Sequence, residues 1–348
     1  MPVLRYLIKR VFWAVFVLFA VSIFTFVIFF IVPADQTRFG RGTGALELSL
    51  RENYGLEELS LPSEHAHFVW NLVRHGTFGE SYESNTAVID ILAAAIPVTA
   101  SLVVGGAILF LLLAVPIGIV SALRPRSLVD RGTMLFVLIG VSAHPAWIGL
   151  VLSYFLGFKW HITPISGYCD FFNPVSSCGG GLQWAHHLVL PWLTFAILFA
   201  GLYARMIRAN ILESIDEDYV RTARAKGAPE WLVLRSHVLR NAMLPVVTML
   251  GMDVGIAFGG AIFIENVYSL PGVGRIVVAA LLRRDLPVIL GVVLFVTFVI
   301  VVLNLIVDLL YAWLDPRVRV SGEPALGKAE QAPRAQPSPQ PVPTGPTL

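Results

Sequence analysis

Residues 219–245 read YVRTARAKGAPEWLVLRSHVLRNAMLP, a basic and alanine-rich stretch in the middle of a very apolar chain. Of all 348 residues, 56% are hydrophobic and 14% are charged, whereas soluble globular domains have roughly 45–50% and 25%. This composition indicates a polytopic membrane protein. The quoted stretch is therefore a polar segment that separates two apolar ones.

Six apolar runs are candidates for helices that cross a bilayer, which takes about 20 residues. We expect them at residues 11–32, within 91–123, and at 134–158, 188–203, 244–264 and 287–313. The first run is longer than the apolar core of a signal peptide, which favours a membrane helix over a cleaved leader. The sequence thus predicts an all-α polytopic membrane protein with six transmembrane helices.

The positions of lysine and arginine predict the orientation, because cytoplasmic loops retain positive charge. With the N-terminus inside, most of the 25 Lys and Arg residues fall in cytoplasmic segments, and the quoted stretch is one of these segments. Both termini are therefore expected in the cytoplasm. The formal net charge of +2 gives no reason to expect a nucleic-acid partner.

Composition divides the chain into four parts. Residues 1–32 hold a cytoplasmic start and the first span, and the polar segment 33–90 is expected to form a small external helical subdomain. Residues 91–320 carry the other five spans and a cytoplasmic loop at 205–243. The tail at 321–348 is rich in proline and has no aromatic residue, so we expect it to be disordered.

The quoted stretch predicts two short helices with a sharp bend between them. Ser214 and Glu217 have the spacing of a capping box, which predicts that a helix begins between them. Gly227 suits the left-handed position that ends a helix. Pro229 suits the first turn of a second helix that runs to about Asn241.

One face of the first predicted helix is small except for one tyrosine. Tyr219, Ala223 and Gly227 are four residues apart and share this face. A basic loop can rest on anionic headgroups, but a headgroup-binding helix has a broad, bulky apolar face, which TARAKG at 222–227 lacks. This composition favours insertion into a groove of a partner protein, with the lipid surface as the alternative.

The stretch resembles the cytoplasmic EAA-type loop of binding-protein-dependent ABC importer permeases. The form DYVRTARAKG…LRNAMLPVVTMLG is similar to that of the dipeptide, oligopeptide and nickel branch. Further family features are LRYLIKRVFWAVFVLF at the start, IVPAD after the first span, ENVYSLPGVGR after the fifth and NLIVDLLYAWLDPRVRV closing the core. Over about residues 3–320 the chain resembles the B-type permease subunit, which implies a type I ABC importer permease fold.

The resemblance implies that the loop docks into a cytoplasmic ATPase and couples ATP-driven closure to movement of the permease. Arg221 stands where the family motif has Glu, which excludes a salt bridge through a motif glutamate. The residues implied in coupling are Tyr219, Arg221, Thr222, Ala223, Ala225, Lys226 and Gly227.

The implied partners are a homologous second permease, two ATP-binding cassette subunits, an external substrate-binding protein and membrane lipid. The implied location is the prokaryotic inner membrane. The implied substrate is a dipeptide or oligopeptide, with a nickel complex as the alternative.

No motif for catalysis or ATP binding occurs in the sequence. It lacks the G-x-x-x-x-G-K-[ST] phosphate loop, H-E-x-x-H and G-x-S-x-G. We therefore expect a transport subunit that is not an enzyme, has no catalytic residue, metal or cofactor, and relies on partners for ATP hydrolysis.

Two acidic residues lie within predicted spans, where ionisable groups mark functional sites by default. Asp253, in the fifth span, can be a polar contact between helices, can line a substrate path, or can carry an ion in a secondary transporter that acts alone. This last role is the alternative function. Asp308 lies near the end of the sixth span and is expected to reach the interface.

The segment after the fifth span predicts a Pro-Gly turn and then a short amphipathic helix from about Arg275 to Arg284. In the family this segment lies beneath the docked binding protein, so Pro271, Gly272 and Gly274 are candidates for an outer gate. A plain interfacial helix is the alternative.

Two cysteines, Cys169 and Cys178, lie in a predicted outer loop. An oxidising compartment permits a disulfide there. Free thiols are the alternative, and a metal site with His186 and His187 is disfavoured because neither spacing nor count matches a zinc pattern.

Overall fold

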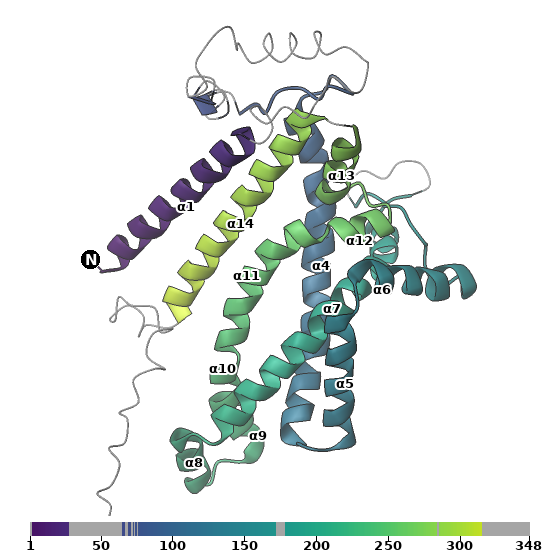
Figure 1. The fold of residues 1–348 in the computed structure, drawn as a ribbon. Coiled ribbons are helices and arrows are strands. Elements are labelled where there is room, and N and C mark those ends of the chain that lie inside the picture. The colour runs from purple at the N-terminus through teal and green to yellow at the C-terminus, as the bar shows by residue number, and fades with distance from the viewer. Residues whose placement is uncertain are drawn as a thin grey trace, which may run out of the picture.

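Helices make up the regular structure of the computed structural model (Figure 1). The predicted all-α class is confirmed, since no strand occurs in the described ranges. Most of the predicted external subdomain at 33–90 and the whole predicted tail at 321–348 lie outside the described residues. The structure describes residues 2–27, 65–66, 69–70, 72, 74, 76–171, 178–283 and 285–314.

Three helices are long and apolar enough to cross a membrane individually: α4 (Val88–Leu123), α7 (Gly181–Ile215) and α14 (Leu286–Leu314). Two bent helix pairs raise the number to five if each pair is one span. The apolar part of α1 (Pro2–Phe26) is shorter, at residues 10–25. Length and composition therefore give three to five spans in the described residues, against the six predicted.

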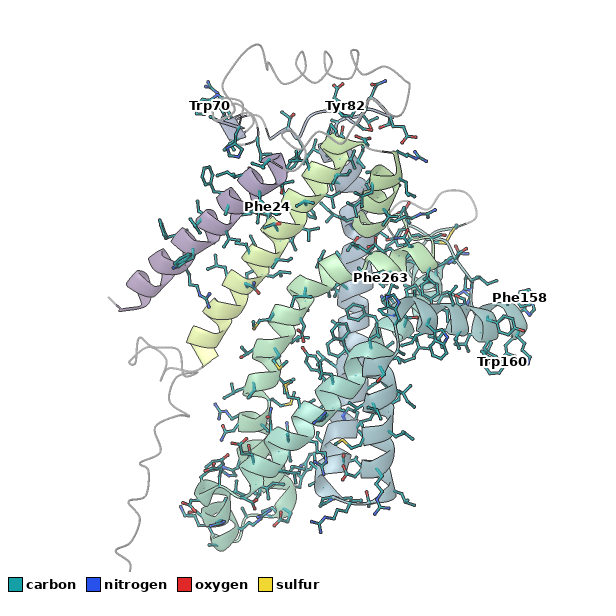
Figure 2. The ribbon with its side chains drawn as sticks, in the orientation of Figure 1. Phe24, Trp70, Tyr82, Phe158, Trp160 and Phe263 are labelled. Atoms are coloured by element: carbon teal, nitrogen blue, oxygen red, sulfur yellow. A yellow bond between two sulfur atoms is a disulfide. The ribbon has the colours of Figure 1, made fainter. Side chains whose placement is uncertain are left out.

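The third predicted span is bent rather than straight. It consists of α5 (Leu128–Ser142), followed by α6 (Pro145–Leu152) and the π-helical turn η3 (Ser153–Lys159), and the two parts meet at 107°. Proline disfavours a helical conformation in the residue before it, and His144 is extended, with φ −71° and ψ 138°. Figure 2 shows Phe158 and Trp160 at the tip of the resulting side arm.

The core lies between α4 and α7, which pack along much of their lengths. Small residues allow close approach between membrane helices. A methyl group at Gly118 would lie 2.9 Å from the carbonyl oxygen of Ala204 on α7. Aromatic rings fill the middle of this contact, with Phe110 of α4 against Phe195, Phe199 and Tyr203 of α7.

The remaining helices define two ends of the molecule (Figure 1). One end carries the turn between α4 and α5 together with the helices of the quoted stretch, and two short helices after α11 lie toward the other end, with α12 further from that end than α13. The helices of the quoted stretch are α8 (Asp218–Ala225), α9 (Glu230–Val233), the π-helical turn η4 (Leu234–Val238) and α10 (Leu239–Ala242). Helix α11 (Leu244–Gly260) then leads to the two short helices, α12 (Ile262–Val267) and α13 (Val273–Arg283).

Candidate functional site

The quoted stretch begins with a helix break rather than with the predicted capping box. Helix α7 continues to Ile215 because Ile207 and Ile211 stay fully buried in the core. Ser214 thus lies inside α7, and Glu217 becomes the residue before α8 with no side-chain capping bond. The capping-box prediction was wrong because burial of an apolar face outweighed the local capping signal.

The bend after α8 has the predicted left-handed glycine. Gly227 has φ +80°. Its N–H donates to the Arg224 carbonyl at 2.9 Å, while the N–H of Ala228 donates to the Ala223 carbonyl at 3.3 Å. This is the Schellman pattern of a helix C-terminus. Pro229 directly precedes α9, one position earlier than predicted.

One face of α8 packs against the rest of the chain. Val220 is fully buried and Ala223 is 9% exposed, and both belong to the core cluster that includes Val233 and Val238. The predicted small face is therefore divided, because Ala223 points inward while Tyr219 is 38% exposed. Ala223 lies three residues after Val220, and burial of that larger side chain turns Ala223 toward the core.

Other side chains of the two helices are exposed, and some of these are large and apolar. Trp231 is 67% exposed and Leu232 is 47% exposed. Neither residue was among the predicted coupling residues, although a tryptophan in a polar segment is itself a signal of an interface. Six of the predicted coupling residues are also exposed: Tyr219, Arg221, Thr222, Ala225, Lys226 and Gly227. We call Tyr219, Thr222, Lys226, Trp231 and Leu232 the α8–α9 surface.

An ion pair ties α7 to the α4–α5 turn at the same end. Arg208 contacts Asp130 through two nitrogens, with Nε 2.6 Å from Oδ1 and a terminal nitrogen 3.0 Å from Oδ2. The Ser121 hydroxyl donates to Oδ1 at 2.5 Å, and the backbone N–H of Arg126 donates to Oδ2 at 2.8 Å. A two-point guanidinium contact fixes orientation as well as distance. This group therefore joins three helices, and sequence analysis did not identify it.

Asp253 lies against α7 in the middle of the molecule. Its Oδ2 accepts a hydrogen bond of 2.6 Å from the hydroxyl of Tyr203, which is fully buried. The contact joins α11 to α7, as the helix-contact interpretation expects. Asp253 itself is only partly buried, so a path-lining role stays a prediction. Asp308 lies in α14, but its side chain is outside the described part of the chain.

The predicted outer turn is organised by a buried carboxylate, Glu265, which was not among the predicted site residues. Glu265 has no exposed surface. Its Oε1 accepts from the Thr99 hydroxyl of α4 at 2.6 Å, and its Oε2 accepts from the backbone N–H of Arg275 at 3.0 Å. Burial raises the pKa of Glu265, while these donors oppose the rise. The turn is thus fastened both to α4 and to the start of α13.

Two predicted gate residues, Gly272 and Gly274, line this carboxylate. A methyl group at Gly272 would lie 2.3 Å from Cδ of Glu265, and one at Gly274 would lie 2.6 Å from Cα of Ile262. Both glycines are buried, whereas Pro271 is exposed. The helix after the turn begins at Val273, slightly earlier than predicted.

A second buried carboxylate holds the segment before α4. Asp285 accepts from the Ser81 hydroxyl at 2.5 Å and from the backbone N–H of Tyr82 at 3.2 Å. Arg283 forms an ion pair with Glu83 nearby. These bonds fasten residues 81–83 to the junction of α13 and α14.

Cys169 and Cys178 form a disulfide, with Cα atoms 5.3 Å apart. His187 Nδ1 lies 3.3 Å from the sulfur of Cys169 and 2.9 Å from the carbonyl oxygen of Gln183. His186 Nε2 instead lies 3.0 Å from the carbonyl oxygen of Ile162. Disulfide sulfurs are not thiolates, so this cluster has the ligand chemistry of a crosslink rather than of a zinc site.

Two protein-family models match regions of the chain that contain nearly all of the elements described above. A family model described as binding-protein-dependent transport system inner membrane component matches residues 114–320, and a model of the N-terminal part of such membrane components matches residues 3–103. Together the two matches include the α8–α9 surface, α11 and the outer turn.

Three curated relatives are similar over about nine-tenths of the chain. A probable peptide ABC transporter permease protein of Sinorhizobium fredii is 34% identical over 317 residues, which are 90% of this chain and 99% of the relative. A putative peptide transport system permease protein of Brucella abortus is 36% identical, with 90% and 98% covered. The dipeptide transport system permease protein of Escherichia coli is 32% identical, with 91% and 99% covered.

Proposed function

The chain belongs to the family of binding-protein-dependent transport system inner membrane components, and on this basis we propose that it is a permease subunit of an ATP-driven ABC importer for peptides. The observation that carries the proposal is similarity over almost the full length to permeases of peptide and dipeptide transport systems. A nickel complex has no comparable support among these relatives.

The α8–α9 surface is the proposed contact with a cytoplasmic ATPase. It combines the aromatic side chains of Tyr219 and Trp231 with the apolar Leu232, and aromatic residues are enriched at the centres of protein interfaces. Docking would bury Trp231, which is 67% exposed. Ala223 is not part of this contact because it packs inward.

Movement of a docked ATPase would reach the spans through the inner face of the same helices. Val220, Ala223, Val233 and Val238 pack in one cluster with residues of α7 and α11. A packed interior transmits displacement rather than absorbing it. The permease would therefore change orientation when the ATPase subunits close on ATP.

The full importer would contain a homologous second permease, two ATPase subunits and an external binding protein that delivers the peptide. The chain would lie in the prokaryotic inner membrane with both termini in the cytoplasm. The basic character of the α4–α5 turn and of the quoted stretch, which lie at one end of the molecule, supports this orientation (Figure 1).

A secondary transporter that uses Asp253 is the less favoured alternative. The family assignment speaks against it, and the carboxylate of Asp253 already accepts a short hydrogen bond from Tyr203. An ion carrier in this position would have to exchange that bond for the ion during each cycle.

A paired tryptophan experiment tests the proposal. The tagged chain is purified from native membranes as wild type, as Trp231→Ala and as Trp160→Ala. Trp160 is 57% exposed but lies at the tip of the side arm, away from α8 and α9 (Figure 2). We expect wild type and Trp160→Ala to retain an ATPase pair and a second permease, and Trp231→Ala to lose the ATPases.

The same preparations are reconstituted with the binding protein to measure ATP-dependent dipeptide uptake. Uptake should follow ATPase retention across the three proteins. Purification of the wild type without any ATPase, together with uptake driven by an ion gradient alone, would overturn the proposal and favour the Asp253 alternative.

A further inference from the structure

An apolar groove lies between α4 and α5, close to the turn that connects them. It has a volume of about 390 Å³, within the range of roughly 300–1,000 Å³ typical of ligand pockets. At Gly132 an added methyl group would meet no atom within 4 Å, so the missing side chain helps to keep the groove open. Its lining comes from Pro116, Ile117 and Val120 of α4 and from Gly132, Thr133 and Phe136 of α5.

Three exposed arginines surround the turn at the end of this groove: Arg124, Arg126 and Arg131. Arg124 is one helical turn after Val120, and its N–H donates to the Val120 carbonyl at 3.2 Å. Arg131 directly precedes Gly132. One groove-lining residue, Val120, is thus one helical turn from an arginine, and another, Gly132, is adjacent to an arginine in the sequence.

The charge of these arginines is not neutralised within the turn. Asp130, the acidic residue closest in sequence, is held by Arg208 and by the Ser121 hydroxyl. Among the residues that the structure describes, no carboxylate forms an ion pair with the guanidinium group of Arg124, Arg126 or Arg131. The turn therefore presents a net positive charge beside an apolar groove.

We propose that this groove and turn bind one anionic phospholipid. The acyl chain would lie along Ile117, Val120 and Phe136, and the phosphate would be held by the arginine side chains. Guanidinium groups match phosphate geometry through paired donors, and basic pockets at the cytoplasmic ends of membrane helices select anionic headgroups. The proposal rests on the proposed cytoplasmic position of the turn, but not on peptide transport.

A protein partner would fit this surface less well. A protein partner would have to place acidic side chains against all three arginines, because a charge that is buried without a partner is costly. A zwitterionic lipid would occupy the apolar part but would gain little from net positive charge. An anionic diacyl lipid satisfies both parts of the site at once.

Lipid retention in the intact complex tests the proposal. The complex is reconstituted in nanodiscs of phosphatidylcholine with one-fifth phosphatidylglycerol, released into the gas phase, and analysed for bound lipid by native mass spectrometry. The charge variant is Arg124→Gln/Arg126→Asn/Arg131→Gln, with Asn at position 126 because Arg126 has φ +64°, which Asn tolerates. A control removes three other exposed arginines at the same end, as Arg205→Gln/Arg235→Gln/Arg240→Gln.

We expect the wild type and the control to retain one phosphatidylglycerol in preference to phosphatidylcholine. Each arginine near a headgroup should contribute roughly fivefold to affinity, so the charge variant should lose on the order of 100-fold. Equal losses in the charge variant and the control would mean that general positive charge, not this site, attracts the lipid.

Filling the groove provides an independent test that leaves the arginines in place. Gly132→Leu adds a side chain where the backbone has free space, so the fold should tolerate it. We expect Gly132→Leu to lower retention of phosphatidylglycerol at least tenfold, while Gly132→Ala stays close to wild type. Two results would overturn the proposal: a wild-type complex that shows no preference for phosphatidylglycerol, or a Gly132→Leu complex that retains it as well as wild type does. A second permease that covered the groove would produce the former result.

Discussion

Substitution of Gly272 by alanine should destabilise the protein strongly, because the outer turn is closed around a buried carboxylate. The new Cβ would lie 2.3 Å from both Cδ and Oε1 of Glu265. The carboxylate would have to move, which would break its bonds with the Thr99 hydroxyl at 2.6 Å and the Arg275 N–H at 3.0 Å. A buried hydrogen-bonding group that loses its partner costs about 1–3 kcal/mol, so the loss of both bonds should cost about 2–6 kcal/mol.

Thermal unfolding of the purified protein measures this cost, with Gly132→Ala as a matched control. A methyl group at Gly132 meets no atom within 4 Å, and alanine in a helix is better than glycine by about 1 kcal/mol. We expect Gly272→Ala to lower Tm by on the order of 10 °C and Gly132→Ala to leave it unchanged or raised. In the background of Glu265→Ala, the effect of Gly272→Ala should nearly vanish, because the clashing atoms are absent. Equal effects of Gly272→Ala with and without Glu265 would refute the reasoning.

Three further predictions concern single contacts. Burial raises the pKa of Glu265 above its ordinary value of 4.5. The stabilising contribution of the protonated Glu265 is therefore full below about pH 4.5 and is lost as pH rises through the folded-state pKa. Glu265→Gln should flatten the plot of Tm against pH over that window, and an unchanged slope would contradict the prediction. Replacing Cys169 and Cys178 by serine should cost about 2–3 kcal/mol for a sequence separation of 9, and dithiothreitol should lower Tm of the wild type but not of the variant. Asp253→Asn keeps an oxygen that can accept from the Tyr203 hydroxyl, so the complex should elute intact in gel filtration, and its loss would rule out a path-lining role.

The sequence predicted the fold class, the family and the left-handed glycine at position 227, because these depend on composition, long motifs and local backbone chemistry. It failed where packing decided the outcome. The capping box at Ser214 was overruled by continued burial of α7, and Ala223 turned inward with Val220. Hydropathy alone gave one span across the bend at Pro145, whereas the proline itself is the local signal of a kink.

The most informative residues of the outer turn were also hidden from sequence analysis. Glu265 is near the end of an apolar run, and only the three-dimensional structure brings Thr99, 166 positions earlier, within hydrogen-bonding distance. The glycines of the turn were recognised as candidates for a gate, but their closest contact is with this carboxylate. Long-range polar contacts of this kind leave no periodic pattern in a single sequence.

Helix α7 is fastened by polar side chains at three levels, and this arrangement bears on how one end of the molecule can influence the other. Near α8 it carries Arg208, which holds Asp130. Halfway along it carries Tyr203, which donates to Asp253. Further toward its start, Thr194 lies 2.7 Å from the hydroxyl of Tyr268, three residues after Glu265.

Each of these contacts joins α7 to a different helix or turn, so displacement of α8 would be expected to move the outer turn with α7 rather than to bend α7 alone. Pro191 precedes Thr194 and lies inside α7, but it is on the far side of all three contacts from α8. The segment that must stay rigid, residues 194–215, therefore contains no proline. A helix segment with no internal proline, held by polar contacts at three levels, is the simplest physical means by which displacement of α8 could reach the opposite end of the protein.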